Sequence, residues 1–171
     1  EGDVSRALLD ESSFSHVKRR LPWLTLGLFG GVLAAVVVGK FEETLANELI
    51  LAAFIPAIVY MADAVGSQTQ MLFIRALSIN QDVSLRKYLI RGLTVHYMLG
   101  MILAGIIFGT SFLWHESIVI SSILGLSIFL TVCFTVIIAI VLPWFFHTRG
   151  QDPAVASGPL ATVLRDIMSL C

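Results

Sequence analysis

The chain has 171 residues, of which 57% are hydrophobic and 13% charged, with a net charge of −1 and a mean hydropathy of +0.88. Soluble domains carry about a quarter charged residues, so this composition excludes an ordinary soluble domain and indicates a membrane protein. Cys133 and Cys171 provide neither a disulfide framework nor metal-ligand spacing. No nucleophile–base pair stands out, so we expect no enzyme and no nucleic-acid partner, but a multi-pass protein of the cell membrane in contact with the lipid bilayer.

Four apolar segments follow a polar lead-in of residues 1–20. Crossing the hydrocarbon core takes roughly 20 residues, so each segment is long enough to span a membrane. We expect these spans at residues 21–39, 45–77, 88–112 and 118–145. A fifth apolar segment begins at Pro153 and reaches residue 171 without a polar flank, so we expect the chain to end inside a helix. The predicted fold is an all-α integral membrane domain over residues 21–171, with five transmembrane helices, the fifth truncated.

The second segment is longer than a bilayer requires. Pro56 and the polar run 66–70 lie inside it and predict a kink or an interruption of the helix. Irregular backbone is tolerated at membrane depth only where it faces protein or a wet cavity. Residues 40–44 and 78–87 are expected to form polar connectors.

Basic residues gather at one group of segment ends. The opposite group holds only Lys40, whereas the basic group holds Lys18, Arg19, Arg20, Arg75, Arg86, Lys87, Arg91 and Arg149. Cytoplasmic loops carry the excess of lysine and arginine, so we predict a cytoplasmic N-terminus and a fifth helix that runs outward.

Three aspartates lie in or beside the apolar segments: Asp63, Asp152 and Asp166. A carboxylate at mid-bilayer costs about 3 kcal/mol on insertion scales, so an acid there is a candidate functional residue. Asp166 lies fourteen residues after Asp152, which on a helix returns it to within about 40° of the same face, about 21 Å along the axis. Small residues lie between the two acids and leave a path open: Ser157, Gly158 and Thr162.

Each acid of the fifth segment also has a structural interpretation. Asp152 followed by Pro153 is an ordinary helix start, with the acid as N-cap and the proline in the first helical position. Asp166 could form an ion pair with an arginine of a neighbouring helix, whereas Arg165 points about 100° away from it on the same helix. Under that interpretation Asp166 stabilises an assembly and conducts nothing.

Asp63, Ser67 and Gln70 are spaced four and three residues apart, which places them on one face of a helix. Their oxygen atoms are hard ligands, which suit Mg²⁺, Ca²⁺ or Mn²⁺ better than Zn²⁺ or copper.

The same stretches resemble the membrane domain of the MgtE family of magnesium channels and transporters. Residues 56–77, which contain GSQT and end in IRAL, are similar to the second-helix motif of that family. Residues 152–166, DPAVASGPLATVLRD, are similar to its fifth-helix motif, which begins Asp-Pro-Ala and ends Thr-Leu-x-Asp.

The resemblance implies a homodimer with a pore on its two-fold axis, lined by the second and fifth helices. It implies that Asp166 holds a hydrated Mg²⁺ in the pore, that Asp152 lies at the cytoplasmic mouth, and that Gly158 lies at the gate. Asp63 is a departure, because the family has a glycine-glycine-asparagine stretch where this chain has Ala62, Asp63 and Ala64.

We therefore predict transport of a divalent cation, Mg²⁺ first and Mn²⁺ or another divalent ion as alternatives. The predicted metal ligands are Asp166, Asp63 and Asp152, and the predicted pore-lining residues are Ser67, Gln70, Gly158 and Thr162. Two alternatives stay open. One is Na⁺- or H⁺-coupled exchange or efflux, and the other is a non-conducting regulatory or assembly subunit whose acids pair with Arg165 and Arg75.

Overall fold

Six helices make up the part of the chain that the structure describes. The computed structural model describes residues 13–79, 84–151 and 153–170, and within these ranges it contains no strand. In chain order the helices are α2 (Ser13–Gly39), α3 (Glu42–Asn47), α4 (Leu49–Ile79), α5 (Leu85–His115), α6 (Ile118–Thr148) and α7 (Pro153–Leu170). The described residues therefore form the all-α fold that the composition predicts.

Four helices are long and apolar enough to cross a membrane. They are Leu21–Gly39 within α2 and the whole of α4, α5 and α6, in the places where four spans were predicted. Helices α4, α5 and α6 have 31 residues each, about 46 Å in length, and exceed a hydrocarbon core of about 30 Å. In the described part of the chain α7 does not reach the same apolarity. A fifth membrane-spanning helix therefore stays a prediction.

The helices extend further into the polar connectors than the sequence indicated. The chain turns at Lys40 and Phe41, and α3 begins at Glu42 inside the connector predicted at residues 40–44. Glu42 and Glu43 lie in the first turn of α3, where a negative charge favours a helix N-terminus. The lead-in is also partly helical, because α2 begins at Ser13, whereas residues 1–12 lie outside the described part.

Helix α4 is continuous, so an interruption at Pro56 or at residues 66–70 is wrong, whereas the kink that was predicted as its alternative stays a prediction. The polar side chains of this run find partners without breaking the helix. The Thr69 hydroxyl donates to the carbonyl of Val65, and Gln70 reaches across to α7. Polar residues inside a membrane helix need no break in the backbone when neighbouring helices satisfy them.

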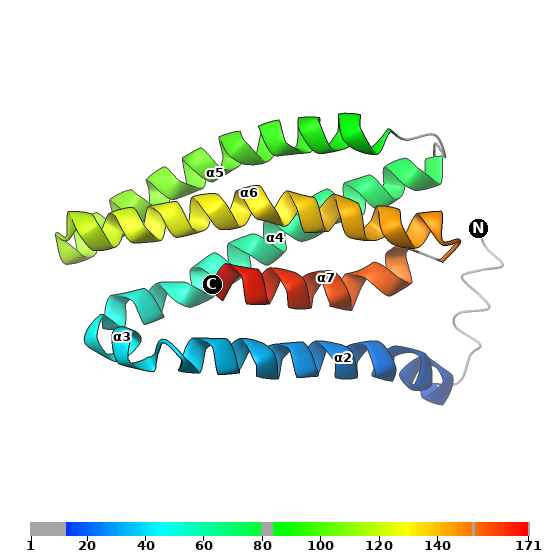
Figure 1. Ribbon diagram of the computed structural model, residues 1–171, viewed down its shortest axis with the longest axis horizontal. Helices are drawn as coiled ribbons and strands as arrows, with labels where there is room; N and C mark the ends of the chain where they lie inside the picture. The colour runs from blue at the N-terminus through cyan, green and yellow to red at the C-terminus, as the bar shows by residue number, and fades with distance from the viewer. Residues whose placement is uncertain (1–12, 80–83, 152, 171) are drawn as a thin grey trace.

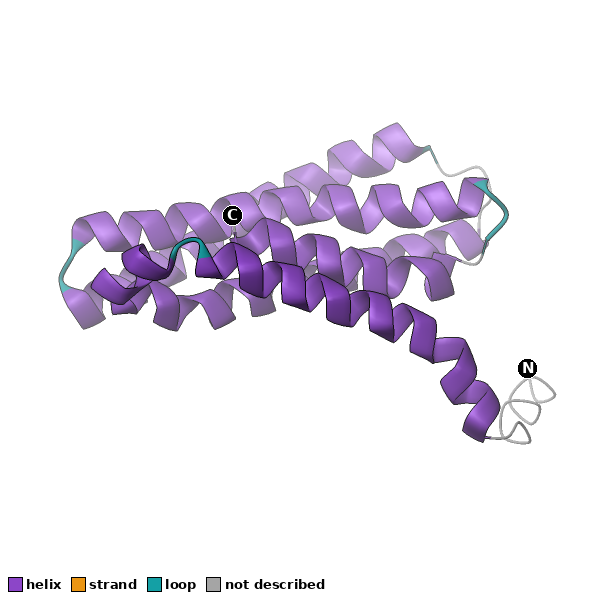
Figure 2. Cartoon of the chain, turned by 60° about the horizontal axis from the view of Figure 1, so that its bottom comes forward, coloured by secondary structure: helices purple, strands orange, loops and turns teal. Residues whose placement is uncertain are grey.

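The helices are arranged around α6, which packs against α4, α5 and α7 (Figure 1). Helix α5 packs on α6 at the top of that view, and α2 lies at the bottom, where it packs on α7. The N-terminal half of α2 diverges from the other helices (Figure 2). Helix α7 thus lies between α2 and the pair formed by α4 and α6.

The core between α4 and α6 is apolar at both ends and small or polar in the middle. One apolar cluster joins Ile50, Phe54 and Ile58 to Leu124, Ile128 and Val132, and the other joins Phe73 and Leu77 to Val136 and Ile140. Between them the buried face of α4 carries Ala62, Gly66 and Gln70, four residues apart. This spacing keeps all three on one helix face, and their size and polarity leave room for a side chain of α7.

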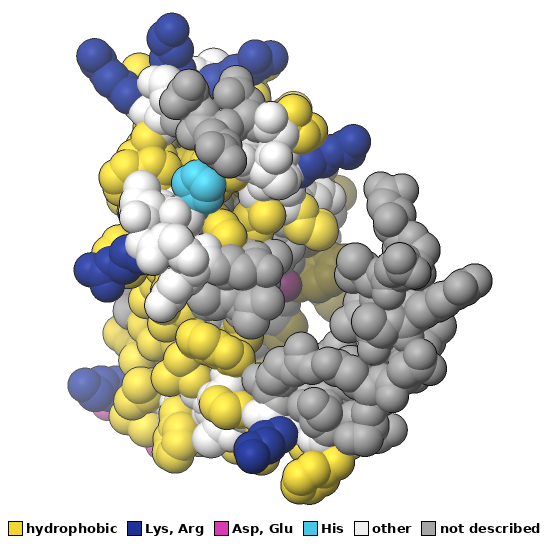
Figure 3. Space-filling model, turned by 90° about the vertical axis from the view of Figure 1, so that its right-hand side faces the viewer, with side chains coloured by type: hydrophobic (Ala, Val, Ile, Leu, Met, Phe, Trp, Pro, Cys, Tyr) yellow, Lys and Arg dark blue, Asp and Glu magenta, His cyan; other side chains and the backbone are white. Residues whose placement is uncertain are grey.

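Basic side chains lie at one end of the bundle. In Figure 1, α2 and α5 begin at the right-hand end, where α4 and α6 finish. The space-filling view of that end shows dark-blue side chains along its edge (Figure 3). The structure thus brings together the segment ends that carry the basic group of the sequence.

Candidate functional site

Arg165 of α7 fills the small and polar middle of the α4–α6 core. Its side chain is 2% exposed. The helix that carries it, α7, also contains Pro159 in its interior. A guanidinium keeps its charge in a protein, so a buried arginine needs a counter-charge and hydrogen-bond acceptors. The side chains of α4 supply most of them.

The counter-charge of Arg165 is Asp63. Arg165 Nη2 lies 3.0 Å from Asp63 Oδ1, and the Asp63 side chain is 46% exposed. The sequence predicted Asp63 as a cation ligand, and the structure places its carboxylate on a cationic side chain of its own chain. The Ser67 hydroxyl, one turn further along α4, also lies 3.4 Å from Asp63 Oδ1.

Hydrogen bonds extend this ion pair along both helices. The guanidinium of Arg165 donates over 3.4 Å to each of three oxygens: Gln70 Oε1, Ser67 Oγ and Thr162 Oγ1. Gln70 Nε2 in turn donates to Ser157 Oγ of α7 over 2.9 Å, and the Ser157 hydroxyl contacts the carbonyl of Pro153. The buried Nε of Arg165 has no partner among the described residues. Helices α4 and α7 are therefore joined by a polar network centred on one arginine.

Gly66 makes room for the arginine. A Cβ at this position would lie 2.6 Å from Arg165 Cδ and 2.6 Å from Thr135 Cγ2, and it would also overlap Arg165 Nη1. Thr135 comes from α6, so three helices converge at this glycine. The close approach requires the absence of a side chain at residue 66.

A pocket of about 470 Å³ lies next to this network, between α4 and α7. It is lined by Ser67, Gln70, Met71, Ile74, Arg75, Ser78, Gly158, Thr162 and Arg165. All four residues that the sequence predicted as pore-lining (Ser67, Gln70, Gly158 and Thr162) are in this lining. The structure therefore brings the predicted faces of the second and fifth segments together, and it adds two arginines that the prediction left out.

Asp166 is half-buried and lies outside that lining. Among the described residues its carboxylate forms no ion pair, although Arg165 precedes it in the chain. Its backbone carbonyl accepts a hydrogen bond from Ser169 Oγ over 2.9 Å. The structure thus distinguishes two acids that were both predicted as metal ligands, because among the described residues Asp63 is paired and Asp166 is not.

Asp152, the third predicted ligand, lies outside the described residues. The helix that it precedes begins at Pro153, as the sequence indicated. In the described part of the chain no three His, Cys, Asp or Glu side chains come close enough to hold a metal ion. One copy of the chain thus supplies no carboxylate-rich metal centre in the part described.

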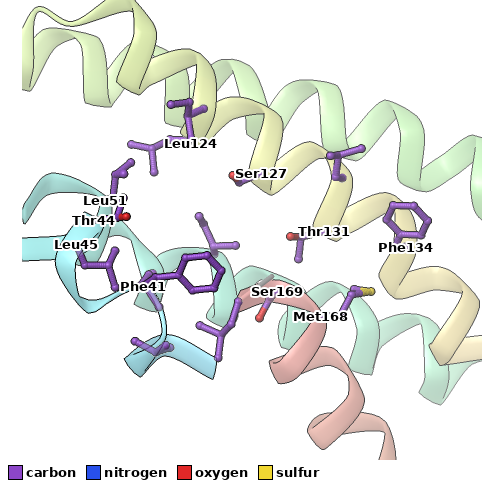
Figure 4. A pocket seen from close by; sticks show the side chains of 16 residues that line it. Phe41, Thr44, Leu45, Leu51, Leu124, Ser127, Thr131, Phe134, Met168 and Ser169 are labelled. Atoms are coloured by element: carbon purple, nitrogen blue, oxygen red, sulfur yellow. The ribbon is translucent and has the colours of Figure 1, made fainter. Parts of the chain in front are cut away.

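A second pocket, of about 480 Å³, lies near the C-terminal end of α7 (Figure 4). Side chains of α4 and α6 line it together with Phe41, Thr44, Met168 and Ser169. The lining carries hydroxyl groups and no charged side chain. It therefore offers no acid to a cation.

Arg165 and His96 are buried, and neither was predicted as a metal ligand or a pore-lining residue. Arg165 was named only in the non-conducting alternative, as a partner of the acids. Arg165 was expected to point away from Asp166 and was not assigned to Asp63, because one helix alone does not show which neighbour it faces. His96 of α5 is also buried, with Nε2 3.1 Å from Thr69 Oγ1 and Nδ1 2.8 Å from the carbonyl of Gly92. It joins α5 to α4 at Thr69, next to Gln70 in the chain. A lone histidine within an apolar segment was the feature of the sequence that could have indicated a buried polar contact.

Comparison with known proteins decides the family. The pattern of the MgtE family, described as a divalent cation transporter, matches residues 55–171, which contain α5, α6, α7 and most of α4. This chain belongs to the MgtE family. It is a multi-pass membrane protein of a family of transporters, not of enzymes.

Three MgtE relatives are similar over most of the chain, and each is named a magnesium transporter. The protein of Bacillus subtilis (strain 168) is 32% identical over 164 residues, which cover 94% of this chain and 36% of the relative. The Thermus thermophilus protein is 28% identical, covering 88% of this chain and 34% of the relative, and the Enterococcus faecalis protein is 25% identical, covering 95% and 36%. The chain therefore spans about a third of the length of these MgtE relatives.

Proposed function

We propose that this chain transports divalent cations, Mg²⁺ first, along a path lined by α4 and α7 of two copies. Asp166 and its copy in the second subunit hold the ion. The observation that carries the proposal is the contrast between two acids on the packed helices α4 and α7. Asp63 has its charge met by Arg165 at 3.0 Å, whereas Asp166 has no ion pair among the described residues. An unpaired acid in a membrane helix costs free energy, which a cation would recover.

The side chains beside Asp166 suit a hydrated ion. Thr162 and Gly158 precede it by one and two helical turns, and they line the pocket together with Ser67 and Gln70 of α4. These groups offer hydroxyl and amide oxygens and little bulk. Mg²⁺ gives up its water reluctantly, so a path of this kind would carry it with its inner water shell in place.

A second copy of the chain supports this assignment on charge grounds. One subunit presents one unpaired acid on the described residues of α4 and α7, whereas Mg²⁺ carries two positive charges. Two Asp166 carboxylates around a two-fold axis would balance the ion. A two-fold axis is also the commonest symmetry of protein oligomers.

The three relatives named magnesium transporters support Mg²⁺ as the first ion to test. The basic residues at the ends of α4 and α6 and at the starts of α2 and α5 support a cytoplasmic placement of that end (Figure 3). With this orientation the proposed transport runs inward from the opposite end, and Asp152 would concentrate cations at the cytoplasmic mouth.

The second candidate function is a non-conducting membrane module. The ion pair between Asp63 and Arg165 favours it, because such a module would use its acids to hold helices together. It requires Asp166 to be paired as well, for instance with Arg75 of another copy. Coupled exchange of Na⁺ or H⁺ has no observation of its own among the described residues.

Growth of a bacterial strain that depends on external Mg²⁺ tests the proposal. The full chain should restore growth at low Mg²⁺, and Asp166→Ala should not, with equal amounts of both proteins in the membrane. Rescue by Asp166→Ala at the wild-type level would contradict the assignment of Asp166. The non-conducting alternative predicts that Asp166→Asn lowers assembly or thermal stability and changes no ion flux.

A further inference from the structure

We propose that Asp63 and Arg165 form a fixed charge pair that sets the cation affinity of the path, with Asp63 as the counter-ion of Arg165 and not as a cation ligand. Asp166 is then the one uncompensated acid among the described residues of α4 and α7. This inference rests on the proposed function, because it assigns a role relative to the path at Asp166. It names two residues that set the affinity for the cation without binding it.

The geometry supports it through the unequal burial of the two partners. The Arg165 side chain is 2% exposed, whereas the Asp63 side chain is 46% exposed. The guanidinium is buried whereas the carboxylate is only half-buried, so the charge of Arg165 has to be balanced by protein. Asp63 is the acid within ion-pair distance of it among the described residues. Its other acceptors, on Gln70, Ser67 and Thr162, are neutral.

The guanidinium also adjoins the proposed path. Arg165 lines the same pocket as Ser67, Gly158 and Thr162, and Asp166 follows it in the chain. A positive charge at this place would repel a cation unless a negative charge lies beside it. Asp63 Oδ1 lies 3.0 Å from Arg165 Nη2, so its negative charge offsets the positive charge of Arg165 beside the path.

Stability alone gives a poor reason for this arrangement. A buried ion pair is on average no more stabilising than well-packed apolar side chains of the same size. Here the buried Nε of Arg165 has no described partner, and Gly66 lacks a side chain where the arginine passes. The arrangement places two opposite charges next to the path, and it leaves one buried donor without a described partner.

The inference predicts opposite effects for the two halves of the pair. Asp63→Asn leaves the positive charge of Arg165 unbalanced, so the Mg²⁺ concentration for half-maximal transport should rise. Arg165→Gln leaves the carboxylate of Asp63 unbalanced, so that concentration should fall. Each shift should be about tenfold, which corresponds to about 1.4 kcal/mol of interaction between the unbalanced charge and the ion.

Uptake by the full chain, reconstituted in liposomes that contain a Mg²⁺-sensitive dye, tests this. The Mg²⁺ concentration for half-maximal uptake and the maximal rate of uptake are measured separately for wild type, Asp63→Asn, Arg165→Gln and the double variant. The double variant has no net charge at the pair and should return close to the wild-type half-maximal concentration. Asp63→Glu and Arg165→Lys keep both charges and should also stay close to it, which gives a test even if a neutral variant folds poorly.

Three results would overturn the inference. The two single variants could leave the half-maximal concentration unchanged, as a merely structural pair would. They could shift it in the same direction. The double variant could resemble Asp63→Asn, as a cation-ligand role of Asp63 requires.

Asp166→Asn in the same assay separates a failure of the charge-pair inference from a failure of the proposed function. If Asp166→Asn takes up Mg²⁺ like wild type, the proposed function itself is contradicted. Loss of uptake in Asp166→Asn without opposite shifts at the pair contradicts the charge-pair inference alone.

Discussion

Gly66 of α4 and Arg165 of α7 adjoin so closely that one added carbon atom would overlap the arginine. A Cβ at residue 66 would lie 2.6 Å from Arg165 Cδ and 2.6 Å from Thr135 Cγ2. The glycine therefore determines whether α7 can place its guanidinium between α4 and α6. The ion pair with Asp63 depends on that placement.

Gly66→Ala should destabilise the protein by about 1–3 kcal/mol, because the methyl group would overpack this site and displace Arg165. An exposed helical glycine behaves in the opposite way, since alanine gains about 1 kcal/mol in helix propensity. Gly105→Ala in α5 is the matched control, because nothing lies within 4 Å of a Cβ there. Thermal unfolding in detergent measures both variants. Equal melting temperatures for the two would contradict the close approach.

Gln70→Ala should cost about 1–3 kcal/mol, because it removes the donor to Ser157 and an acceptor of Arg165 from a buried site. Gln68→Ala is the control, since Gln68 lies on the same helix and is exposed. The difference in unfolding free energy between the variants checks the α4–α7 network. A loss of stability that is as large in Gln68→Ala would show that the network is not where the structure places it.

Asp63→Asn should destabilise the protein more than Arg165→Met, although both break the same ion pair. The first leaves a buried guanidinium without counter-charge, which costs about 3 kcal/mol or more. The second leaves a carboxylate that is already 46% exposed and fills the slot with an apolar chain, so it should cost less. Chemical or thermal unfolding of both variants measures the asymmetry. The reverse order would mean that Asp63, and not Arg165, is the buried partner.

The charged ends of the bundle predict which side each loop faces. A cysteine at exposed Lys40 should react with a membrane-impermeant maleimide in intact cells, whereas a cysteine at exposed Gln151 should react only after the membrane is opened. The experiment requires a background in which the native cysteines are replaced. Labelling of Gln151→Cys in intact cells and protection of Lys40→Cys would reverse the proposed orientation.

The membrane spans could be predicted from sequence because each is a long apolar run with polar flanks. The exact ends of the helices could not be predicted, because polar residues also form helix. They make up much of α3, and the last turns of α4 continue through them. The interruption predicted in α4 was wrong for a related reason. Thr69 and Gln70 are polar in sequence, but their partners on the same helix and on α7 keep the helix intact.

The site could be predicted in part. Helical phase placed Asp63, Ser67 and Gln70 on one face of α4, and family resemblance paired that face with Gly158 and Thr162 of α7. Neither could show that Arg165 turns into the core and takes Asp63 as its partner, because that depends on how two helices face each other in space. The small residue at Gly66 was the signal, since it marks a place where a neighbouring helix comes close.

The position of a bound divalent cation would show whether Asp166 holds the ion. Crystals of the full chain grown with Mn²⁺ in place of Mg²⁺ would give an anomalous difference peak for the ion. We predict a peak on the two-fold axis, about 4–5 Å from both Asp166 carboxylates, as expected for an ion that keeps its inner water shell. The peak should disappear in Asp166→Asn and persist in Asp63→Asn at raised Mn²⁺. A peak bound to Asp63 instead, or one that survives in Asp166→Asn, would contradict the account.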